Sequence, residues 1–186
     1  MATNTNQQFD KIISICQDIF AKKMKDYGTA WRILRPSSIT DQIFIKIQRI
    51  RSIETKGFSK VNEGVRDEYI GIINYASMGI IQLKLGYSDK PEMNHEEALK
   101  LYLSNLNAAK ELMISKNHDY DEAWRKMRLS SITDLMLMKI HRTKQIEDNE
   151  GNTIISEGID ANYLDLINYA IFAMIKIEFG DQLENN

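Results

Sequence analysis

A stretch of 24 residues occurs twice in this chain. Residues 26–49 read DYGTAWRILRPSSITDQIFIKIQR, and residues 119–142 read DYDEAWRKMRLSSITDLMLMKIHR, with 14 identical positions in a gapless alignment. Similarity of this kind at a fixed spacing indicates a tandem duplication. Asp, Tyr, Trp, Arg and Lys are retained, whereas several apolar positions change type. A constraint on the core alone would keep the apolar spacing and let polar residues change, so the repeat predicts a polar site that was built twice.

The rest of the chain predicts an all-α protein. Only two prolines and nine glycines interrupt it, and apolar residues recur at three- and four-residue spacing, which is typical of amphipathic helices. We expect a helical bundle made of two three-helix repeats related by a pseudo-two-fold axis, packed as one globular unit. The expected divisions are residues 1–86 for the first repeat, 87–93 for a linker and 94–186 for the second repeat. The expected helices cover about 6–25, 38–54, 62–85, 94–118, 131–146 and 156–179.

Capping residues mark several of these boundaries. Ser38, with Asp41 three residues later, resembles a capping box, and Asp134 takes the same place in the second repeat. Asn94 with Glu97 predicts the start of the fourth helix.

Composition excludes several classes of partner. The formal net charge of −2 gives no electrostatic reason to expect direct binding to nucleic acid. No uncharged apolar stretch is long enough to cross a bilayer, and the first residues lack the pattern of a signal peptide. The single cysteine, Cys16, excludes an intramolecular disulfide and fits a reducing compartment. We therefore expect a cytoplasmic protein without a membrane partner; a homodimer is one of the oligomeric states that the sequence leaves open.

Two pairs of cations are candidates for binding an anion. Lys46 and Arg49 lie three residues apart on a predicted helix, and Lys139 and Arg142 repeat them. On a helical wheel they flank an apolar stripe. Such cations either extend their charged ends into solvent or hold an anionic ligand such as a phosphate.

Two loops retain an acid, a tyrosine and a tryptophan. The tryptophans either anchor the loops on the core or stack on a planar ligand. Loops usually vary freely, so joint retention predicts a binding surface. These candidates are Asp26, Tyr27 and Trp31 in the first repeat and Asp119, Tyr120 and Trp124 in the second.

The two repeats differ on one face of their third helices. Glu68 and Gly71 in the first correspond to Asn162 and Asp165 in the second. Two carboxylates one turn apart could bind Mg²⁺ while leaving positions for phosphates, but here each repeat keeps only one of the two. A site for Mg²⁺ would then depend on Asp165 with a partner, either Glu157, Asp134 or Glu68 from the other repeat; Glu63, Asp67 and Asp160 are further acids nearby. The alternative is that Asp165 forms a structural ion pair with Arg142 or Lys139.

Several short motifs, in this order, resemble a known family. They are Lys116-Asn117-His118-Asp119-Tyr120, then Lys139-x-x-Arg142, then Glu157, and then Asp165-Leu-Ile-Asn-Tyr169-Ala. Together they are similar to the nucleotide modification associated domain of bacteria and phages, a family that resembles the all-α NTP pyrophosphatases (the MazG-like and dimeric dUTPase-like enzymes). The resemblance implies a helical bundle, a Mg²⁺ site built from helix carboxylates and hydrolysis of nucleoside triphosphates to monophosphates. It adds Asn168 and Tyr169 to the candidate ligand-binding residues. The family often has Asp immediately before the Lys-x-x-Arg motif, where this chain has Ile45 and Met138.

Three functions are consistent with these patterns. The first is binding, with or without Mg²⁺-dependent hydrolysis, of a nucleotide, a modified nucleotide or another phosphorylated small molecule. The second is a catalytically inactive nucleotide sensor or assembly module of the same fold, and the third is a purely structural bundle. The carboxylate pair that is split between the repeats keeps the second and third open.

Overall fold

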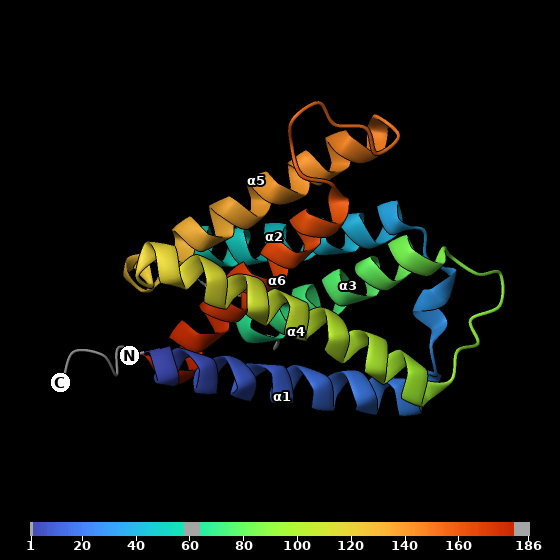
Figure 1. The fold of residues 1–186 in the computed structure, drawn as a ribbon, viewed down its shortest axis with the longest axis horizontal. Coiled ribbons are helices and arrows are strands. Elements are labelled where there is room, and N and C mark those ends of the chain that lie inside the picture. The colour runs from blue at the N-terminus through green and yellow to red at the C-terminus, as the bar shows by residue number, and fades with distance from the viewer. Residues whose placement is uncertain (1, 58–63, 181–186) are drawn as a thin grey trace.

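The computed structural model describes residues 2–57 and 64–180. Over these residues the chain forms six α-helices and two short 3₁₀ helices and contains no strand (Figure 1), which confirms the predicted all-α class. None of the described helices is long and apolar enough to cross a membrane. In chain order the elements are α1 (Ala2–Tyr27), η1 (Ala30–Ile33), α2 (Pro36–Lys56), α3 (Val65–Leu85), α4 (His95–Tyr120), η2 (Ala123–Lys126), α5 (Leu129–Asp148) and α6 (Ile159–Phe179).

The two most buried helices lie in the middle of the bundle. α3 and α6 pack against each other; α2 packs on α3, α5 on α6, and α2 and α5 also touch. α1 and α4 lie side by side along one edge, as Figure 1 shows in blue and yellow-green. One hydrophobic cluster includes buried residues from all six helices. The two halves of the sequence therefore share one core.

The helix starts differ in part from the prediction. α2 begins at Pro36, whose missing N–H and fixed φ suit the first turn, and its N-cap Arg35 makes no side-chain cap. α5 likewise begins after Arg128 without a side-chain cap, so the capping boxes predicted from Ser38 and its repeat are wrong. The cap of α4 is confirmed, because the Asn94 side chain accepts hydrogen bonds from the backbone N–H groups of Glu96 and Glu97.

The two acids of the supposed capping boxes instead cross between the halves. Asp41 on α2 pairs with Lys144 on α5 at 2.8 Å, and Asp134 on α5 faces Arg51 on α2 at 3.9 Å. The two pairs are equivalent to each other in the repeat. In each, an aspartate of one half pairs with a basic residue of the other half.

A buried hydroxyl cluster shows the same exchange. The Thr40 hydroxyl donates to Glu147 at 2.6 Å and lies 2.7 Å from the Tyr163 hydroxyl. In the other half Thr133 donates to Glu54 at 2.8 Å and is hydrogen-bonded to Tyr69. Thr133, Glu54 and Tyr69 are the repeat equivalents of Thr40, Glu147 and Tyr163. Each cluster therefore combines a threonine of one half with a glutamate and a tyrosine of the other half. Reciprocal contacts are expected of an approximate two-fold relation; the superposition of the halves stays a prediction.

The two tryptophan loops have similar local structure. Each contains a 3₁₀ helix of four residues, η1 or η2, that carries the tryptophan. Each also follows a residue in the left-handed region, Gly28 with φ 67° in the first half and Asp121 with φ 48° in the second. η1 is further tied to the connection between α3 and α4, because the Thr29 hydroxyl donates to the Pro91 carbonyl at 2.8 Å.

Glu147→Gln is expected to raise the melting temperature at neutral pH. Burial raises the pKa of Glu147, although the hydrogen bond from Thr40 acts in the opposite direction. A carboxyl with a raised folded-state pKa stabilises the fold below its unfolded-state pKa, and that contribution is lost as the pH rises through the folded-state value. The glutamine keeps an acceptor for Thr40 and removes the ionisation. The gain measured by thermal unfolding should therefore be present at pH 7, shrink as the pH falls through the raised folded-state pKa, and be absent below about 4.5, the ordinary pKa of this carboxyl.

The matched control for this prediction is Glu111→Gln, at an exposed position on α4. A gain at Glu147 that does not depend on pH, or an equal gain in the control, would contradict the assignment.

Candidate functional site

A cleft of about 400 Å³ opens in the first half between α1, η1, α2 and α3. Four of the residues predicted for the site line it together: Tyr27, Trp31, Lys46 and Glu68. The complete lining is Ile19, Phe20, Lys23, Met24, Tyr27, Gly28, Trp31, Lys46, Asp67, Glu68, Ile70, Gly71, Asn74, Tyr75 and Met78.

Lys46 lies across one wall of this cleft. Its stem covers Gly71, where a Cβ atom would stand only 2.6 Å from Lys46 Cε. Its ammonium lies 3.5 Å from the Glu68 carboxylate, which also accepts a hydrogen bond from Arg49. The same ammonium lies 5.8 Å from the centre of the Tyr75 ring. The buried carboxylate of Glu68 is thus neutralised by the two cations that the sequence singled out as an anion site.

Aromatic rings and one amide form the remaining polar features. Trp31 is buried with its ring tilted against Phe20, while Tyr27 is largely exposed. Partial burial and the neighbouring Tyr75 and Asp26 raise the pKa of Tyr27. The Asn74 side-chain oxygen accepts a hydrogen bond of 2.7 Å from the Tyr102 hydroxyl, and its amide N–H₂ donates to no other group within the described residues. The cleft therefore offers cations, aromatic faces and a hydrogen-bond donor in one concave space.

The second half places a carboxylate where the first half has Gly71. Asp165 is 6% exposed, and its two oxygens accept separate hydrogen bonds, one from Lys116 at 2.8 Å and one from Lys139 at 2.6 Å. Burial opposes ionisation of Asp165, but the two lysines hold its pKa below the ordinary value. The predicted alternative of an ion pair with Lys139 is present in the structure, and Lys116 rather than Arg142 completes it.

The other candidates of the second half are dispersed. Trp124 stacks on Phe172 with ring centres 4.2 Å apart, so it anchors η2 on the core. Tyr120 is 71% exposed, and Asp119 lies 3.2 Å from His118. Asn168 is buried, and its side-chain oxygen has no hydrogen-bond partner within the described residues.

A hollow of about 670 Å³ gathers a second group of predicted residues. Lys139, Arg142 and Glu157 line it together with Asn162 and the connection between α5 and α6. That connection exposes Ile154 and Ile155 almost completely. Lys139 and Asn162 are the repeat equivalents of Lys46 and Glu68, so the hollow overlaps the place of the first-half cleft, but most of its other lining comes from the end of α5 and the α5–α6 connection.

The acids proposed for Mg²⁺ do not converge. Glu68 and Asp165 are each ion-paired to lysines of their own half, and Asp134 faces Arg51. Across residues 2–57 and 64–180, no group of three His, Cys, Asp or Glu side chains is arranged to hold a metal ion. Glu63, a further candidate, lies outside the described residues.

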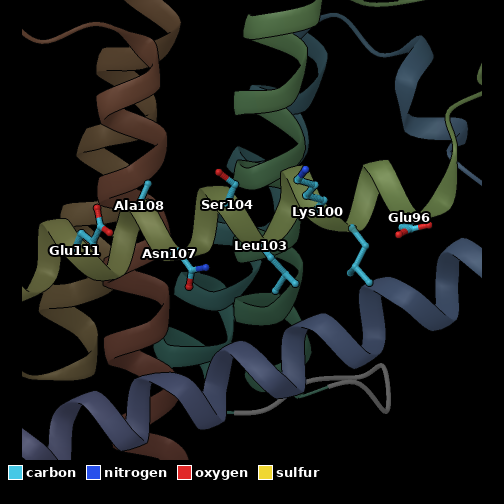
Figure 2. A pocket seen from close by; sticks show the side chains of 8 residues that line it. Glu96, Lys100, Leu103, Ser104, Asn107, Ala108 and Glu111 are labelled. Carbon is cyan, nitrogen blue, oxygen red and sulfur yellow. The ribbon is translucent and has the colours of Figure 1, made fainter.

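A third hollow, of about 710 Å³, lies along α4 and carries none of the predicted residues. Figure 2 shows its side chains arranged along this one helix, with Leu103 pointing toward α1 and Ser104 toward the opposite side. A surface formed by a single helix brings no convergent groups together, so the first-half cleft is the better candidate site.

Two residues of the first-half cleft, Lys23 and Asn74, had not been singled out from the sequence, and Lys116 had been named only as part of a motif that resembles a known family. The signal was available, because Lys23 and Lys116 are equivalent in the repeat and lie just before its most similar stretch. Asn74 and Tyr75 begin the run Asn-Tyr-Ala that recurs at 168–170. Short identical runs outside the longest repeat thus carry information about the site.

Comparison with known proteins identifies one family. The family model described as nucleotide modification associated domain 1 matches residues 23–83 and 116–177. One matched segment lies in each half, and together they cover more than half of the chain. The first segment begins at Lys23 and the second at Lys116. No curated protein and no solved structure matches this chain.

Proposed function

This chain belongs to the nucleotide modification associated domain 1 family, and we propose that the cleft of its first half binds a nucleotide. The observation that carries the proposal is the convergence of Tyr27, Tyr75, Lys46 and Asn74 on one concave space. A cleft of about 400 Å³ is within the usual range for small-molecule sites.

Each part of a nucleotide has a chemically suitable partner in the cleft. The phosphates would lie near Lys23 and Lys46, since ammonium groups bind phosphate as compact point charges. The base would lie against the tyrosine rings, whose faces suit a planar heterocycle. The amide N–H₂ of Asn74, oriented by Tyr102, would donate to a base or sugar oxygen.

Hydrolysis is the second candidate, and one observation favours it. Asp67 and Glu68 both line the cleft, and Mg²⁺ is often held by one or two carboxylates together with substrate phosphates. There it would polarise a phosphoryl group or activate a water, and attack of that water on a nucleoside triphosphate would give a monophosphate and pyrophosphate, the reaction that the motif resemblance to all-α NTP pyrophosphatases implies. Glu68 is already neutralised by Lys46 and Arg49, so binding without turnover is the leading proposal.

A nucleotide panel distinguishes these functions. Nucleoside mono- and triphosphates would be tested with and without Mg²⁺ for their effect on the melting temperature and for release of pyrophosphate. A ligand present at 100 times its Kd stabilises the folded state by about 2.7 kcal/mol. Stabilisation without pyrophosphate supports a binding module, and stabilisation with pyrophosphate supports a hydrolase. If no nucleotide raises the melting temperature, the proposal is wrong and a structural bundle remains.

A further inference from the structure

The two halves arrange the same pair of lysines around different residues. Lys23 and Lys46 in the first half are equivalent to Lys116 and Lys139 in the second, and Gly71 is equivalent to Asp165. In the second half one carboxylate joins both lysines, with one oxygen on each ammonium, at 2.8 and 2.6 Å. A carboxylate that bridges two cations in this way has the geometry of a small bound anion.

In the first half the same position has no side chain. Lys23 and Lys46 both line the cleft beside Gly71. Lys46 Nζ lies 3.0 Å from the place where a Cβ at residue 71 would stand, so an acidic group there would be within its reach. Lys23 forms no ion pair with any residue in the described part of the chain. The lysine pair of the first half therefore lacks the bridging anion that its counterpart has.

The single carboxylate of each half occupies a different turn of the helix. In the first half Glu68 lies one turn before Gly71 and is held by Arg49 and Lys46. In the second half its equivalent is the neutral Asn162, whose amide donates to the Gly158 carbonyl at 2.9 Å. Because the acid lies one turn earlier in the first half, the Lys46 side chain rather than a carboxylate lies beside Gly71, whereas in the second half the Asp165 carboxylate takes this place.

We infer that Asp165 is a built-in anion, which occupies in the second half the position where the first half binds a phosphate group of its ligand. The inference rests on the proposed nucleotide binding for the identity of the ligand, and it goes further in two ways. It assigns the phosphate to the space between Lys23 and Lys46, over Gly71. It also makes the protein asymmetric, with one ligand site per chain instead of two.

Gly71→Asp tests the first-half site directly. The new carboxylate should join the two lysines and compete with the ligand, so that the Kd for the best-binding nucleotide of the panel, measured by calorimetry, rises by about tenfold or more. Gly71→Ala is the matched control, because it adds a Cβ and displaces the flexible end of Lys46 without adding charge. It should bind more tightly than the aspartate variant. If nucleotides bind the parent and the aspartate variant equally well, the inference is wrong although the proposed function stands.

Asp165→Gly tests the second half without relying on nucleotides. Removing the built-in anion should lower the melting temperature and create an open lysine pair, which inorganic pyrophosphate should then fill. We expect pyrophosphate to raise the melting temperature of this variant more than that of the parent, and Asp165→Ala should behave in the same way if the glycine variant does not fold. Equal responses of parent and variants to pyrophosphate would overturn the inference whatever nucleotides do. A larger response of the variants, together with no nucleotide binding by the parent, would leave the built-in anion standing and reject only the proposed function.

Discussion

Lys46→Met is expected to abolish most of the nucleotide-dependent rise in melting temperature, whereas Lys139→Met leaves it intact. Methionine keeps the length of the stem over Gly71 and removes only the charge. A charge-assisted hydrogen bond to phosphate contributes about 1.5–3 kcal/mol, so its loss corresponds to roughly a tenfold to hundredfold weaker Kd. Lys139 is its equivalent in the repeat, but it is already bonded to Asp165 at 2.6 Å.

The measurement is a nucleotide titration followed by thermal unfolding, with far-UV circular dichroism to confirm that both variants remain helical. Both variants remove a lysine that is paired with a carboxylate, so each loses one ion pair. The variants differ because Lys46 lines the first-half cleft and Lys139 does not. An equal loss of binding in the two variants would show that the halves do not differ in the way proposed.

Gly79→Ala is expected to destabilise the fold, although alanine is the better helix former. Helix propensity alone predicts a gain of about 1 kcal/mol. A Cβ at this position would stand 2.8 Å from Cε2 and 2.9 Å from Cζ of the Tyr163 ring. That ring is fully buried, and its hydroxyl lies 2.7 Å from Thr40 and donates to the Pro36 carbonyl at 3.2 Å, so it has little freedom to move. Overpacking of this kind costs about 1–3 kcal/mol, and we expect a net loss in the free energy of unfolding.

Chemical denaturation of the variant measures this effect. The matched substitution is Ala173→Gly, at the equivalent position of α6, where the chain already accepts a Cβ. It should also lower stability, by roughly 1 kcal/mol or more, because it lowers helix propensity and removes buried apolar area. A stabilising Gly79→Ala would show that α3 and α6 do not approach as closely as the structure has them.

The fold could be predicted largely from the sequence because its signals are local. The apolar periodicity from Phe9 to Phe20 predicted α1. Because the two halves repeat each other in sequence, each helix predicted in one half also predicted the equivalent helix in the other. The capping boxes were wrong because Pro36 begins α2 two residues before Ser38. A serine followed by an acid three residues later is informative only where the helix starts at that serine. Asp41 pairs instead with Lys144, a contact between helices that no local pattern contains.

The sequence predicted that several candidate residues lie together, but it did not predict what surrounds Asp165 in the second half. Lys46, Tyr27 and Trp31 do line one cleft, as their joint retention indicated. The difference between the halves at Gly71 and Asp165 is understood only once Lys116 is known to reach across from α4 to α6. The two tryptophans show the same limit. They are equivalent in the sequence, but one borders the cleft and the other is covered by Phe172, which lies 48 residues away along the chain.

The reciprocal hydroxyl clusters determine where the two copies are free to diverge. A change at Thr40 disturbs Glu147 and Tyr163, which belong to the other copy, so a substitution there damages both halves at once. A change at Gly71 or Asp165 touches only lysines of its own copy. The effects of a substitution are therefore shared where the copies meet and confined to one copy where the contacts lie within it. A duplicated chain built in this way can accept a charge-changing substitution at the position of Gly71 and Asp165 in one copy while the contacts between the copies, such as Thr40 with Glu147 and Thr133 with Glu54, stay unchanged.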